Sequence, residues 1–575
     1  MTNQPQFQFA APRGTVEVHL PDGQVISGPR GAAVAEFLKI LPGYEDHPIV
    51  GAVINHHLRE LTYPIRLDAQ VRPVTMGEAD GMRFYRRSLT FLLESAFAEL
   101  FPDFHLTVDH SVSSGGYYCQ VNGRRPLTPA ELAQLEERMR EMVAEDIPFT
   151  RTEVPLEEAI AYFTRRGYTD KVRLLRHRKK EYLVLYALGR HRDYHHGYMV
   201  PSTGYLKWFG LVPTGDGFTL RFPRRHRPTE LLPMPGYPTL LSTFHQYGAW
   251  LQRMGISSVG ALDDAIEQDR YREIVLISEA LHEQRIAEIA RMITERAEDV
   301  RVILIAGPSS SGKTTFSKRL SVQLLAQGIS PYPIEMDNYF VDREHTPRDE
   351  NGDYDFETIE ALNIRRLGED LKRLTAWERV QLPRYDFHTG KSVPGKVVQL
   401  HPGQIIILEG IHGLNPALLP NLPAASTFRI YVSALTQLNL DRHNRVSTTD
   451  TRLIRRIVRD ARTRGYSAQE TIARWESVRR GEKRYIFPYQ ENADVMFNSA
   501  LVYELAALKP LAEPLLRQVP FGTDEHIEAK RLLSFLEWFL PMKGDFIPNN
   551  SILREFIGGS GLEDFQVWQN SHFGL

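Results

Sequence analysis

The stretch Gly307-Pro308-Ser309-Ser310-Ser311-Gly312-Lys313-Thr314 matches the pattern G-x-x-x-x-G-K-[ST]. An apolar run at 302–306 precedes it and indicates a β-strand, and a helical pattern over 315–325 follows it. In this context backbone N–H groups converge on phosphate oxygens, and the N-terminus of the helix adds positive potential. The stretch therefore predicts a nucleotide-binding loop, and it sets the fold of the residues around it.

The loop also predicts its ligands. Lys313 is expected to reach the β- and γ-phosphates of ATP, and the Thr314 hydroxyl is expected to ligate Mg²⁺. ATP and Mg²⁺ are thus the expected cofactors. The predicted ATP-binding residues are Gly307, Pro308, Ser309, Ser310, Ser311, Gly312, Lys313, Thr314 and Thr315.

The pattern around the loop is that of an α/β domain. Four further apolar runs, at 333–336, 405–408, 428–432 and 495–497, alternate with helical segments. Short, nearly continuous apolar strands separated by helices are typical of a parallel sheet covered on both faces. We therefore predict a doubly wound parallel sheet over about 299–510.

Two carboxylates follow strands of this predicted sheet. Asp337 closes the second strand, at the sheet edge where a doubly wound fold binds ligands. It can accept the proton of an attacking hydroxyl or help to hold the metal. Glu409 ends the strand at 405–408 and is expected to ligate Mg²⁺ directly or through water. For either acid taken singly, a helix cap is the alternative.

An arginine stripe forms the third feature. Arg452, Arg455, Arg456 and Arg459 share the spacing i, i+3, i+4 and i+7, which places them on one helix face. Arginine forks suit phosphate oxygens and can neutralise a transferring phosphoryl group. The alternative is a solvated helix face. The position after the fourth strand favours phosphate binding for part of the cluster.

Five motifs accompany the loop, and together they resemble the uridine kinase and phosphoribulokinase group. They are Asp337-Asn-Tyr-Phe340, Tyr354-Asp355-Phe356, Pro383-Arg-Tyr385-Asp-Phe387, Glu409-Gly-Ile-His412 and Asp450-Thr-Arg452-Leu-Ile-Arg455-Arg456-Ile-Val-Arg459-Asp460. The resemblance implies a kinase that transfers the γ-phosphoryl group of ATP to a nucleoside hydroxyl.

The resemblance also implies a role for single residues. Asp337 resembles the base for the sugar 5′-hydroxyl and Asp355 the partner of the ribose hydroxyls, while Tyr385 and Phe387 match aromatics that flank the base. Arg456 matches a substrate-side arginine. The implied catalytic set is Asp337, Lys313, Arg459 and Arg464, and the implied substrate-binding set is Asp337, Tyr339, Asp355, Tyr385, Phe387, Arg456 and Arg474.

The sequence departs from the uridine kinase pattern where the base is read. Gly390 stands in place of a base-reading histidine, and Tyr466 and Arg474 stand where an arginine and a glutamine would help to read a pyrimidine. A site without such buried hydrogen-bonding partners rejects analogues poorly. We therefore expect a broad or shifted base preference.

The N-terminal half carries a second resemblance. Residues 14–75, with a hairpin turn at Pro21-Asp22-Gly23, resemble the ubiquitin-like β-grasp (TGS) module of threonyl-tRNA synthetases. Residues 80–225 resemble the second additional, α+β domain of those synthetases. The predicted units are 1–75 (TGS-like), 76–230 (synthetase-like), 231–298 (helical linker), 299–510 (P-loop domain) and 511–575 (helical extension).

The synthetase-like unit lacks its relatives' editing residues. Arg87 and Phe91 occupy the positions of an H-x-x-x-H pair, and His195 and Met199 those of a C-x-x-x-H pair. The resemblance thus implies that editing chemistry, and a metal at those four positions, are lost. The histidines of the run 191–196 are more often ordinary core or surface residues than ligands.

The composition bears on the partners and the cellular location of the protein. The net charge of −2, from 69 basic and 71 acidic residues, gives no global attraction to nucleic acid or membrane. One cysteine and no signal-peptide pattern favour the cytoplasm. A homo-oligomer is compatible with the sequence. A GTPase is disfavoured because no N-K-x-D motif follows the loop.

One alternative function remains open at this stage, an RNA- or translation-linked nucleotide-binding regulator. The basic run Lys171, Arg173, Arg176, Arg178, Lys179 and Lys180 could contact RNA, although a solvated face is the commoner meaning of such a run.

Overall fold

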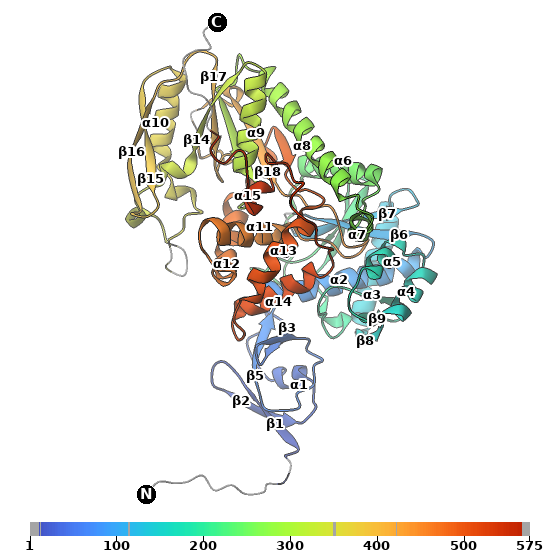
Figure 1. Ribbon diagram of the computed structural model, residues 1–575. Coiled ribbons are helices and arrows are strands. Elements are labelled where there is room, and N and C mark those ends of the chain that lie inside the picture. The colour runs from blue at the N-terminus through green and yellow to red at the C-terminus, as the bar shows by residue number, and fades with distance from the viewer. Residues whose placement is uncertain are drawn as a thin grey trace, which may run out of the picture.

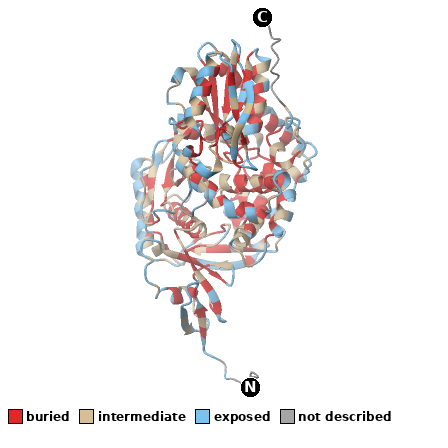
Figure 2. Ribbon diagram, turned by 90° about the vertical axis from the view of Figure 1, so that its left-hand side faces the viewer, coloured by how far each residue is buried: buried red, intermediate tan, exposed pale blue. Residues whose placement is uncertain are grey.

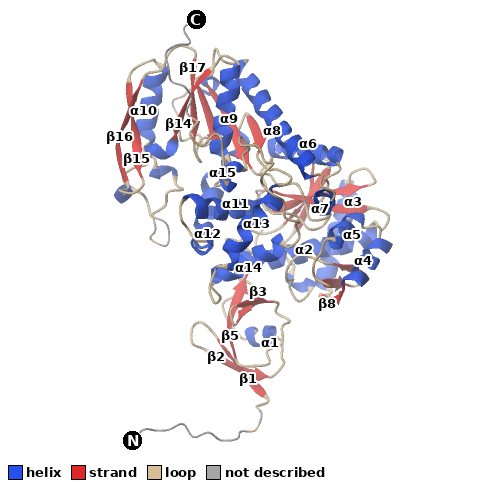
Figure 3. Cartoon of the chain, in the orientation of Figure 1, coloured by secondary structure: helices blue, strands red, loops and turns tan. Residues whose placement is uncertain are grey.

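The computed structural model describes residues 11, 13–112, 115–348, 352, 354–420 and 422–565. Figure 1 shows a small sheet near the N-terminus at one end of the molecule and a larger parallel sheet at the other. Between them lie a second α/β region and a group of helices from the C-terminal part of the chain (Figures 1 and 3). No helix among the described residues combines the length and apolar character needed to cross a bilayer.

The N-terminal sheet domain has β-grasp topology. Its strands run in the order β2-β1-β5-β3-β4, with β1 and β5 parallel and the other pairings antiparallel. Their bounds are β1 Thr15–His19, β2 Val25–Pro29, β3 Ile49–Ile54, β4 His57–Arg59 and β5 Ala69–Thr75, with helix α1 at Val34–Leu38. The inward residues Val16 and Val18 pack against Phe37 of α1. The predicted hairpin between β1 and β2 is confirmed.

The middle domain is built around helix α2, Ala79–Leu100, which is buried on most of its sides. A four-stranded antiparallel sheet and a three-stranded one pack with it. The four-stranded sheet has the order β11-β12-β7-β6 and the three-stranded one β10-β9-β8. Their bounds are β6 His105–Val112, β7 Gly116–Asn122, β8 Thr150–Pro155, β9 Tyr182–Leu188, β10 His191–Asp193, β11 Gly210–Thr214 and β12 Gly217–Arg221; the other helices are α3 Pro129–Ala144, α4 Leu156–Arg165 and α5 Thr169–Arg176.

The expected linker at 231–298 is helical and lies within the fold. Its helices are α6 Pro238–Met254, α7 Val259–Glu267 and α8 Tyr271–Thr294. Ile286, Ile289 and Ile293 of α8 are fully buried in the same core as the parallel sheet. Glu283 of α8 also pairs with Arg319 of the helix after the P-loop, at 2.7 Å. Helix α8 therefore covers the sheet instead of merely connecting two units.

The P-loop domain holds the predicted parallel sheet. Its strands are β13 Val302–Ala306, β14 Ser330–Glu335, β17 Gln404–Glu409, β18 Thr427–Ser433 and β19 Val495–Asn498, in the order β14-β17-β13-β18-β19 with every pairing parallel. Ile303 and Ile305 pack with helices α8 and α9 (Lys313–Ala326), whereas Val302 and Leu304 face the core of α10 (Ile364–Thr375). Burial of both faces explains the nearly continuous apolar strands, and Figure 2 shows these strands buried between helices. The predicted doubly wound α/β fold is confirmed.

The rest of the P-loop domain frames one edge of this sheet. Strands β15 Val380–Asp386 and β16 Lys391–Val398 form an antiparallel hairpin beside α10. Helices α11 Thr448–Thr463 and α12 Ala468–Tyr485 follow β18.

The C-terminal helices return across the molecule. They are α13 Glu504–Arg517, α14 Asp524–Leu536 and α15 Arg554–Ile557. Glu528 of α14 pairs with Arg83 of α2 at 2.9 Å, and Phe521 contacts the rings of His56 and His57 in the N-terminal sheet domain. This part of the chain thus joins all the other parts.

Candidate active site

The P-loop connects β13 to α9 in the conformation that its glycines allow. Gly312 has φ +85° and precedes the first residue of α9, Lys313. A side chain at Gly307 would lie 1.9 Å from the backbone oxygen of Val432, so this position is sterically restricted to glycine. The Lys313 ammonium donates to the carbonyl of Pro308 at 3.4 Å. The loop therefore curls around the amino end of α9, as a phosphate-binding loop must.

A hydroxyl and a carboxylate meet beside the loop. The Thr314 hydroxyl donates to Glu409 Oε2 at 3.2 Å, which brings together the two predicted magnesium ligands. The pKa of Glu409 is raised to about 7, chiefly by burial and also by the charge of the nearby Asp337, while Lys313 opposes the rise. Hydroxyl and carboxylate oxygens are the ligand types that Mg²⁺ prefers, so these residues fit the ion.

Asp337 lies in the turn Met336–Tyr339 directly after β14. Its side chain is exposed, yet partial loss of hydration from the surrounding protein and the charge of Glu335 raise its pKa, while Lys313 and Arg464 oppose the rise. A carboxylate with a raised pKa is a better proton acceptor than an ordinary aspartate. The predicted base thus stands beside Lys313 and Glu409.

Glu357 interacts with both Asp337 and Lys313, and the sequence analysis missed it. Burial raises its pKa to about 7, helped by the charges of Glu482 and Asp337 and opposed by Arg456 and Lys313. Its backbone N–H donates to Asp355 Oδ1 at 3.0 Å. The signal in the sequence is its position two residues after the predicted ribose-binding aspartate, on the same short segment.

The arginine stripe divides into two groups. Arg452 and Arg455 are fully buried and hold the loop from behind: Arg452 bonds Glu482 at 2.8 Å and the Ser309 carbonyl at 2.9 Å. Arg455 bonds Glu504 at 2.5 Å and the Ser310 carbonyl at 3.4 Å. Neither arginine lies on a solvated face.

The second group, Arg456, Arg459 and Arg464, is less buried than the first. Arg456 donates to the Ser309 hydroxyl at 2.8 Å and to Asp460 at 3.2 Å. Arg459 and Arg464 pair with the same Asp460, at 2.9 and 3.4 Å. The Asp460 carboxylate therefore pairs with all three arginines that were predicted to bind phosphate or substrate.

The predicted base-stacking aromatics lie together at the end of the β15–β16 hairpin. The ring centroids of Tyr385 and Phe387 are 5.0 Å apart, and Phe387 is 58% exposed. Tyr385, by contrast, is only 4% exposed and is a core residue. Tyr339 is also buried, and its hydroxyl donates to Asp370 at 3.2 Å, so it packs behind the site. The exposed Arg474 lies over the ring of Tyr466 at 4.4 Å.

Arg343 fills the space beside Gly390, where the base-reading histidine was expected. It donates to the carbonyl of Phe387 at 2.6 Å. A side chain at Gly390, which has φ +69°, would lie 2.8 Å from Arg343 atoms. A guanidinium therefore replaces an imidazole at this position, and the sequence analysis did not anticipate it.

A segment near the C-terminus covers the start of α9. Glu555 accepts hydrogen bonds from the Thr315 N–H at 3.2 Å and from the Thr315 hydroxyl at 2.8 Å. Ile552 lies so close to Gly312 that a Cβ there would be 2.5 Å away. Lys318 donates to the carbonyls of Leu562 and Glu563 at 2.6 and 2.8 Å. The N–H of a predicted ATP-binding residue is therefore already bonded to a carboxylate.

The basic run of the middle domain is not a free cationic surface. Lys171 is fully buried between Asp193 and Asp441, at 3.0 and 2.9 Å. Arg173 pairs with Asp264 at 2.6 Å, and Lys180 pairs with Glu537 at 2.7 Å. Both interpretations of the run, a solvated face and an RNA-binding face, are therefore wrong for the buried Lys171, whereas Arg173 and Lys180 are partly exposed and ion-paired.

Comparisons with known proteins match the two halves of the chain to different proteins. Residues 302–506 match the model of the family described as "Phosphoribulokinase / Uridine kinase family". The C-terminal half thus contains a uridine kinase/phosphoribulokinase domain, as its motifs predicted.

The N-terminal half is similar to threonine–tRNA ligases. The ligase of Desulforamulus reducens is 34% identical over 205 residues, which are 35% of this chain and 32% of that protein. The ligase of an Acidovorax species is 34% identical over 206 residues, with the same coverage. The chain therefore spans about a third of the length of these relatives.

Solved structures overlap with part of the chain. "Structure of a Possible Uridine Kinase from Bacillus stearothermophilus" is 21% identical, covers 37% of this chain and 97% of its own, and has a TM-score of 0.27. D-glycerate 3-kinase from Cryptococcus neoformans is 13% identical, covers 46% of this chain and 89% of its own, and has a TM-score of 0.20.

Proposed function

We propose that this protein is an ATP-dependent nucleoside kinase of the cytoplasm, with a broad or shifted base preference. The observation that carries the proposal is the electrostatic interaction of Asp337 and Glu409 with Lys313 beside an intact P-loop. A phosphoryl-transfer site needs this set: a base, a metal-binding acid and a phosphate-facing cation.

Each residue has one step in the proposed reaction. Asp337 takes the proton of the acceptor hydroxyl as its oxygen bonds to the γ-phosphorus, and the bond from that phosphorus to the β–γ bridging oxygen breaks to release ADP. Lys313, Arg459 and Arg464 balance the charge on the transferring group. Thr314 and Glu409 would hold Mg²⁺, which supplies further neutralisation of the phosphates.

The acceptor is inferred from the hairpin aromatics and Asp355. The exposed Phe387, which packs against the buried Tyr385, offers stacking that tolerates many bases, and Arg343 donates hydrogen bonds only. Asp355 and Glu357 lie together on one segment and suit the hydroxyls of a ribose. We therefore expect discrimination to be stricter at the sugar than at the base.

The test compares kcat/KM for uridine, cytidine, thymidine, adenosine and guanosine with ATP and Mg²⁺. We expect ADP release with several of them, and none from Lys313→Ala, whose fold should be intact because the loop backbone is unchanged. Lys372→Ala, an exposed lysine of α10, is the matched control. If a sugar phosphate stimulates ADP release and no nucleoside does, the acceptor is a sugar phosphate and not a nucleoside. If neither stimulates ADP release, the kinase proposal is contradicted.

A cavity between the domains favours a second function, the binding of RNA by the N-terminal half. The cavity holds about 340 Å³ and is lined by residues of the N-terminal sheet domain, the middle domain and α14. Arg59, Arg87 and Arg178 line it and bond to carbonyl or hydroxyl oxygens. Because no carboxylate bonds them among the described residues, their charges remain available for phosphates.

A gel shift with tRNA tests this second function. We expect affinity to fall steeply with salt, and Arg87→Gln to reduce the salt dependence more than Lys39→Gln, because Lys39, the residue after α1, does not line the cavity. Binding that is absent at low salt, or unchanged in Arg87→Gln, contradicts it.

A further inference from the structure

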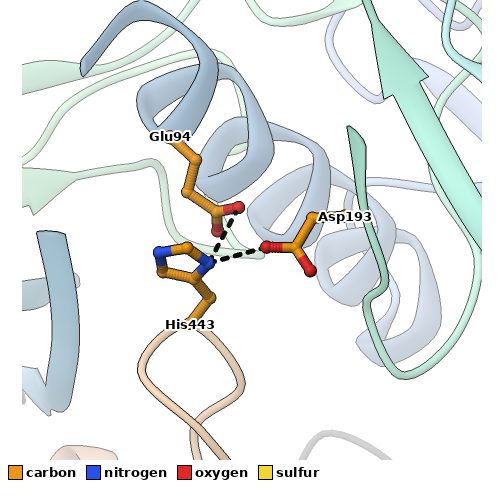
Figure 4. Close-up of side chains that lie close together, drawn as sticks. All are labelled: Glu94, Asp193 and His443. Carbon is orange, nitrogen blue, oxygen red and sulfur yellow. Dashed lines mark hydrogen bonds and ion pairs between the residues drawn. The ribbon is translucent and has the colours of Figure 1, made fainter. Parts of the chain in front are cut away.

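Five titratable side chains from distant parts of the chain converge beneath helix α2. Glu94 comes from α2, His191 and Asp193 from β10, His195 from the turn after β10, and His443 from the loop between β18 and α11. All five are buried, and Glu94 is only 2% exposed. Figure 4 shows the imidazole of His443 between the carboxylates of Glu94 and Asp193.

The spacing of these groups fits a single metal ion. His443 Nδ1 lies 2.8 Å from Asp193 Oδ2 and 3.4 Å from Glu94 Oε2. On the other side of Glu94, the Nε2 atoms of His195 and His191 lie 3.0 and 3.4 Å from its oxygens. Nitrogen and oxygen ligands at about 2.0–2.2 Å from a tetrahedral zinc ion are separated from one another by roughly 3.3–3.6 Å. The two separations of 3.4 Å match the edges of such a tetrahedron, whereas those of 2.8 and 3.0 Å are shorter, so these two contacts would lengthen slightly around an ion.

The charge of the cluster calls for a cation. Glu94, Asp193 and Asp441 are buried carboxylates, and Lys171 is the ammonium that contacts two of them. The neighbouring Arg442 and Asp170 neutralise each other at 2.6 Å. With neutral imidazoles the cluster retains two negative charges in the protein interior, which is unfavourable unless they are balanced. One divalent cation balances both.

The cluster also has unused ligand atoms and a route of entry. His191 Nδ1 is buried and makes no hydrogen bond with any described residue, and the buried Glu94 Oε1 is contacted by His195 Nε2 alone, at 3.0 Å, among the described residues. A cavity of about 220 Å³ reaches Glu94, His191 and His443 from the side of His105 and Arg166. An ion can therefore reach the carboxylate without unfolding the domain.

We propose that Glu94, Asp193 and His443 bind a divalent transition-metal ion of the zinc type, with one of the two histidines that face Glu94 as the fourth ligand. Mixed imidazole and carboxylate donors suit zinc, whereas calcium and magnesium prefer oxygen alone. Because His443 belongs to the P-loop domain and the other ligands to the middle domain, the ion links the two domains. Of the four editing positions, only His195 is a candidate ligand of this site; Arg87, Phe91 and Met199 take no part in it.

The test uses the full chain after removal of metals with a chelator. Cobalt is titrated into the protein, and visible absorption reports a four-coordinate ion. We expect one equivalent of Co²⁺ with visible bands that zinc displaces, and an affinity at least about tenfold weaker in Glu94→Gln and in His443→Ala. His105→Gln, at the mouth of the same cavity, should bind cobalt as the native chain does.

Two further variants make the result decisive. Glu409→Gln should keep the visible bands, because it alters only the predicted magnesium site; loss of the bands in Glu409→Gln assigns the cobalt to the P-loop and overturns the proposal. The absence of visible bands in the native chain, or their full retention in Glu94→Gln, also overturns it. If circular dichroism shows that Glu94→Gln is unfolded, Asp193→Asn takes its place, with the same expected loss.

Discussion

At the residue scale, Lys313 is shared among three acids. Its charge lowers the pKa values of Asp337, Glu357 and Glu409, all of which loss of hydration raises. A bound triphosphate would draw the ammonium toward the phosphates and leave the acids less well balanced. We therefore expect nucleotide binding and metal binding to depend on each other at this site. The metal would balance the acids that Lys313 no longer neutralises once the nucleotide is bound.

Asp337→Asn tests the base. An amide cannot accept the hydroxyl proton, so we expect kcat to fall by about 10²-fold or more while ATP affinity is largely kept. Steady-state kinetics and equilibrium ATP binding measure the two effects. The matched variant is Asp342→Asn, a nearby aspartate whose carboxylate bonds Ser392 in the β15–β16 hairpin. Weakened ATP binding with unchanged kcat would instead make Asp337 a metal-binding residue.

The raised pKa of Glu409 predicts that the affinity for Mg²⁺ depends on pH. Its pKa of about 7 lies above the ordinary glutamate value, so the carboxyl is protonated below about pH 7 and ionised above it. Since Mg²⁺ needs the ionised form, its affinity should be constant above pH 7 and fall by up to about tenfold per pH unit below it. Calorimetric Mg²⁺ titration with ATP present, at pH 6 to 8, measures this. Glu409→Gln should bind Mg²⁺ weakly and lose most of the pH dependence of that binding. If Mg²⁺ affinity in this variant still falls with pH as in the native chain, the titrating group is Glu357 or Asp337 instead.

At the element scale, the amino end of α9 is already bonded to an anion. The first N–H groups of a helix have no partners within it and attract negative charge. Here Glu555 takes the N–H and the hydroxyl of Thr315, while the neighbouring carbonyls hold Lys318. A carboxylate bonded in this way competes with the phosphate oxygens for which the loop is built.

Removing that carboxylate should tighten ATP binding. In Glu555→Ala the Thr315 N–H is free, and a charge near a helix N-terminus is worth about 0.3–1 kcal/mol, so we expect ATP affinity to rise roughly two- to fivefold. Equilibrium titration with a fluorescent ATP analogue measures the change. Glu563→Ala is the control, because Glu563 contacts Lys318 through its backbone carbonyl. Weaker ATP binding in Glu555→Ala would show that Glu555 supports the loop instead of competing for it.

At the scale of the whole molecule, buried charges join the domains. Lys171 of the middle domain is held between Asp193 of the same domain and Asp441 of the P-loop domain, and the Tyr194 hydroxyl donates to Asp441 at 2.5 Å. Arg531 of α14 pairs with Asp450 of α11 at 2.8 Å and with Glu528, which itself pairs with Arg83 of α2. Removing one partner of such a group leaves the others charged and unpaired in the interior.

Lys171→Met tests this connection. The substitution leaves Asp193 and Asp441 without their shared cation, and loss of one partner of a buried pair costs about 3–5 kcal/mol. We expect the unfolding temperature to drop by several degrees, with proteolytic cleavage becoming faster in the loop between β18 and α11. Thermal unfolding and limited proteolysis measure these changes. Lys179→Met, at an exposed position of the same run, should behave like the native chain, and equal stability of both variants contradicts a linking role for Lys171.

The sequence by itself determined the fold of the P-loop domain and the core of its site. The five predicted strands are present, and Lys313, Thr314, Asp337 and Glu409 lie at the loop and at the carboxyl ends of strands, as their local patterns indicate. Strand periodicity and the conformation of a glycine-rich turn depend on neighbouring residues, and parallel strands bring their ends to one edge. Local pattern was therefore sufficient for these residues.

Only the tertiary structure decided which charges are paired. Arg452 meets Glu482, Lys171 meets Asp441 and Thr315 meets Glu555, and the partners of the last two pairs are more than 200 positions apart in the chain. In the sequence, Arg452 and Lys171 have the spacing of exposed cations, and Glu555 lies far from any recognised motif. Whether a charged side chain faces water, a ligand or a buried partner depends on which surfaces pack together, and packing is a property of the folded chain as a whole.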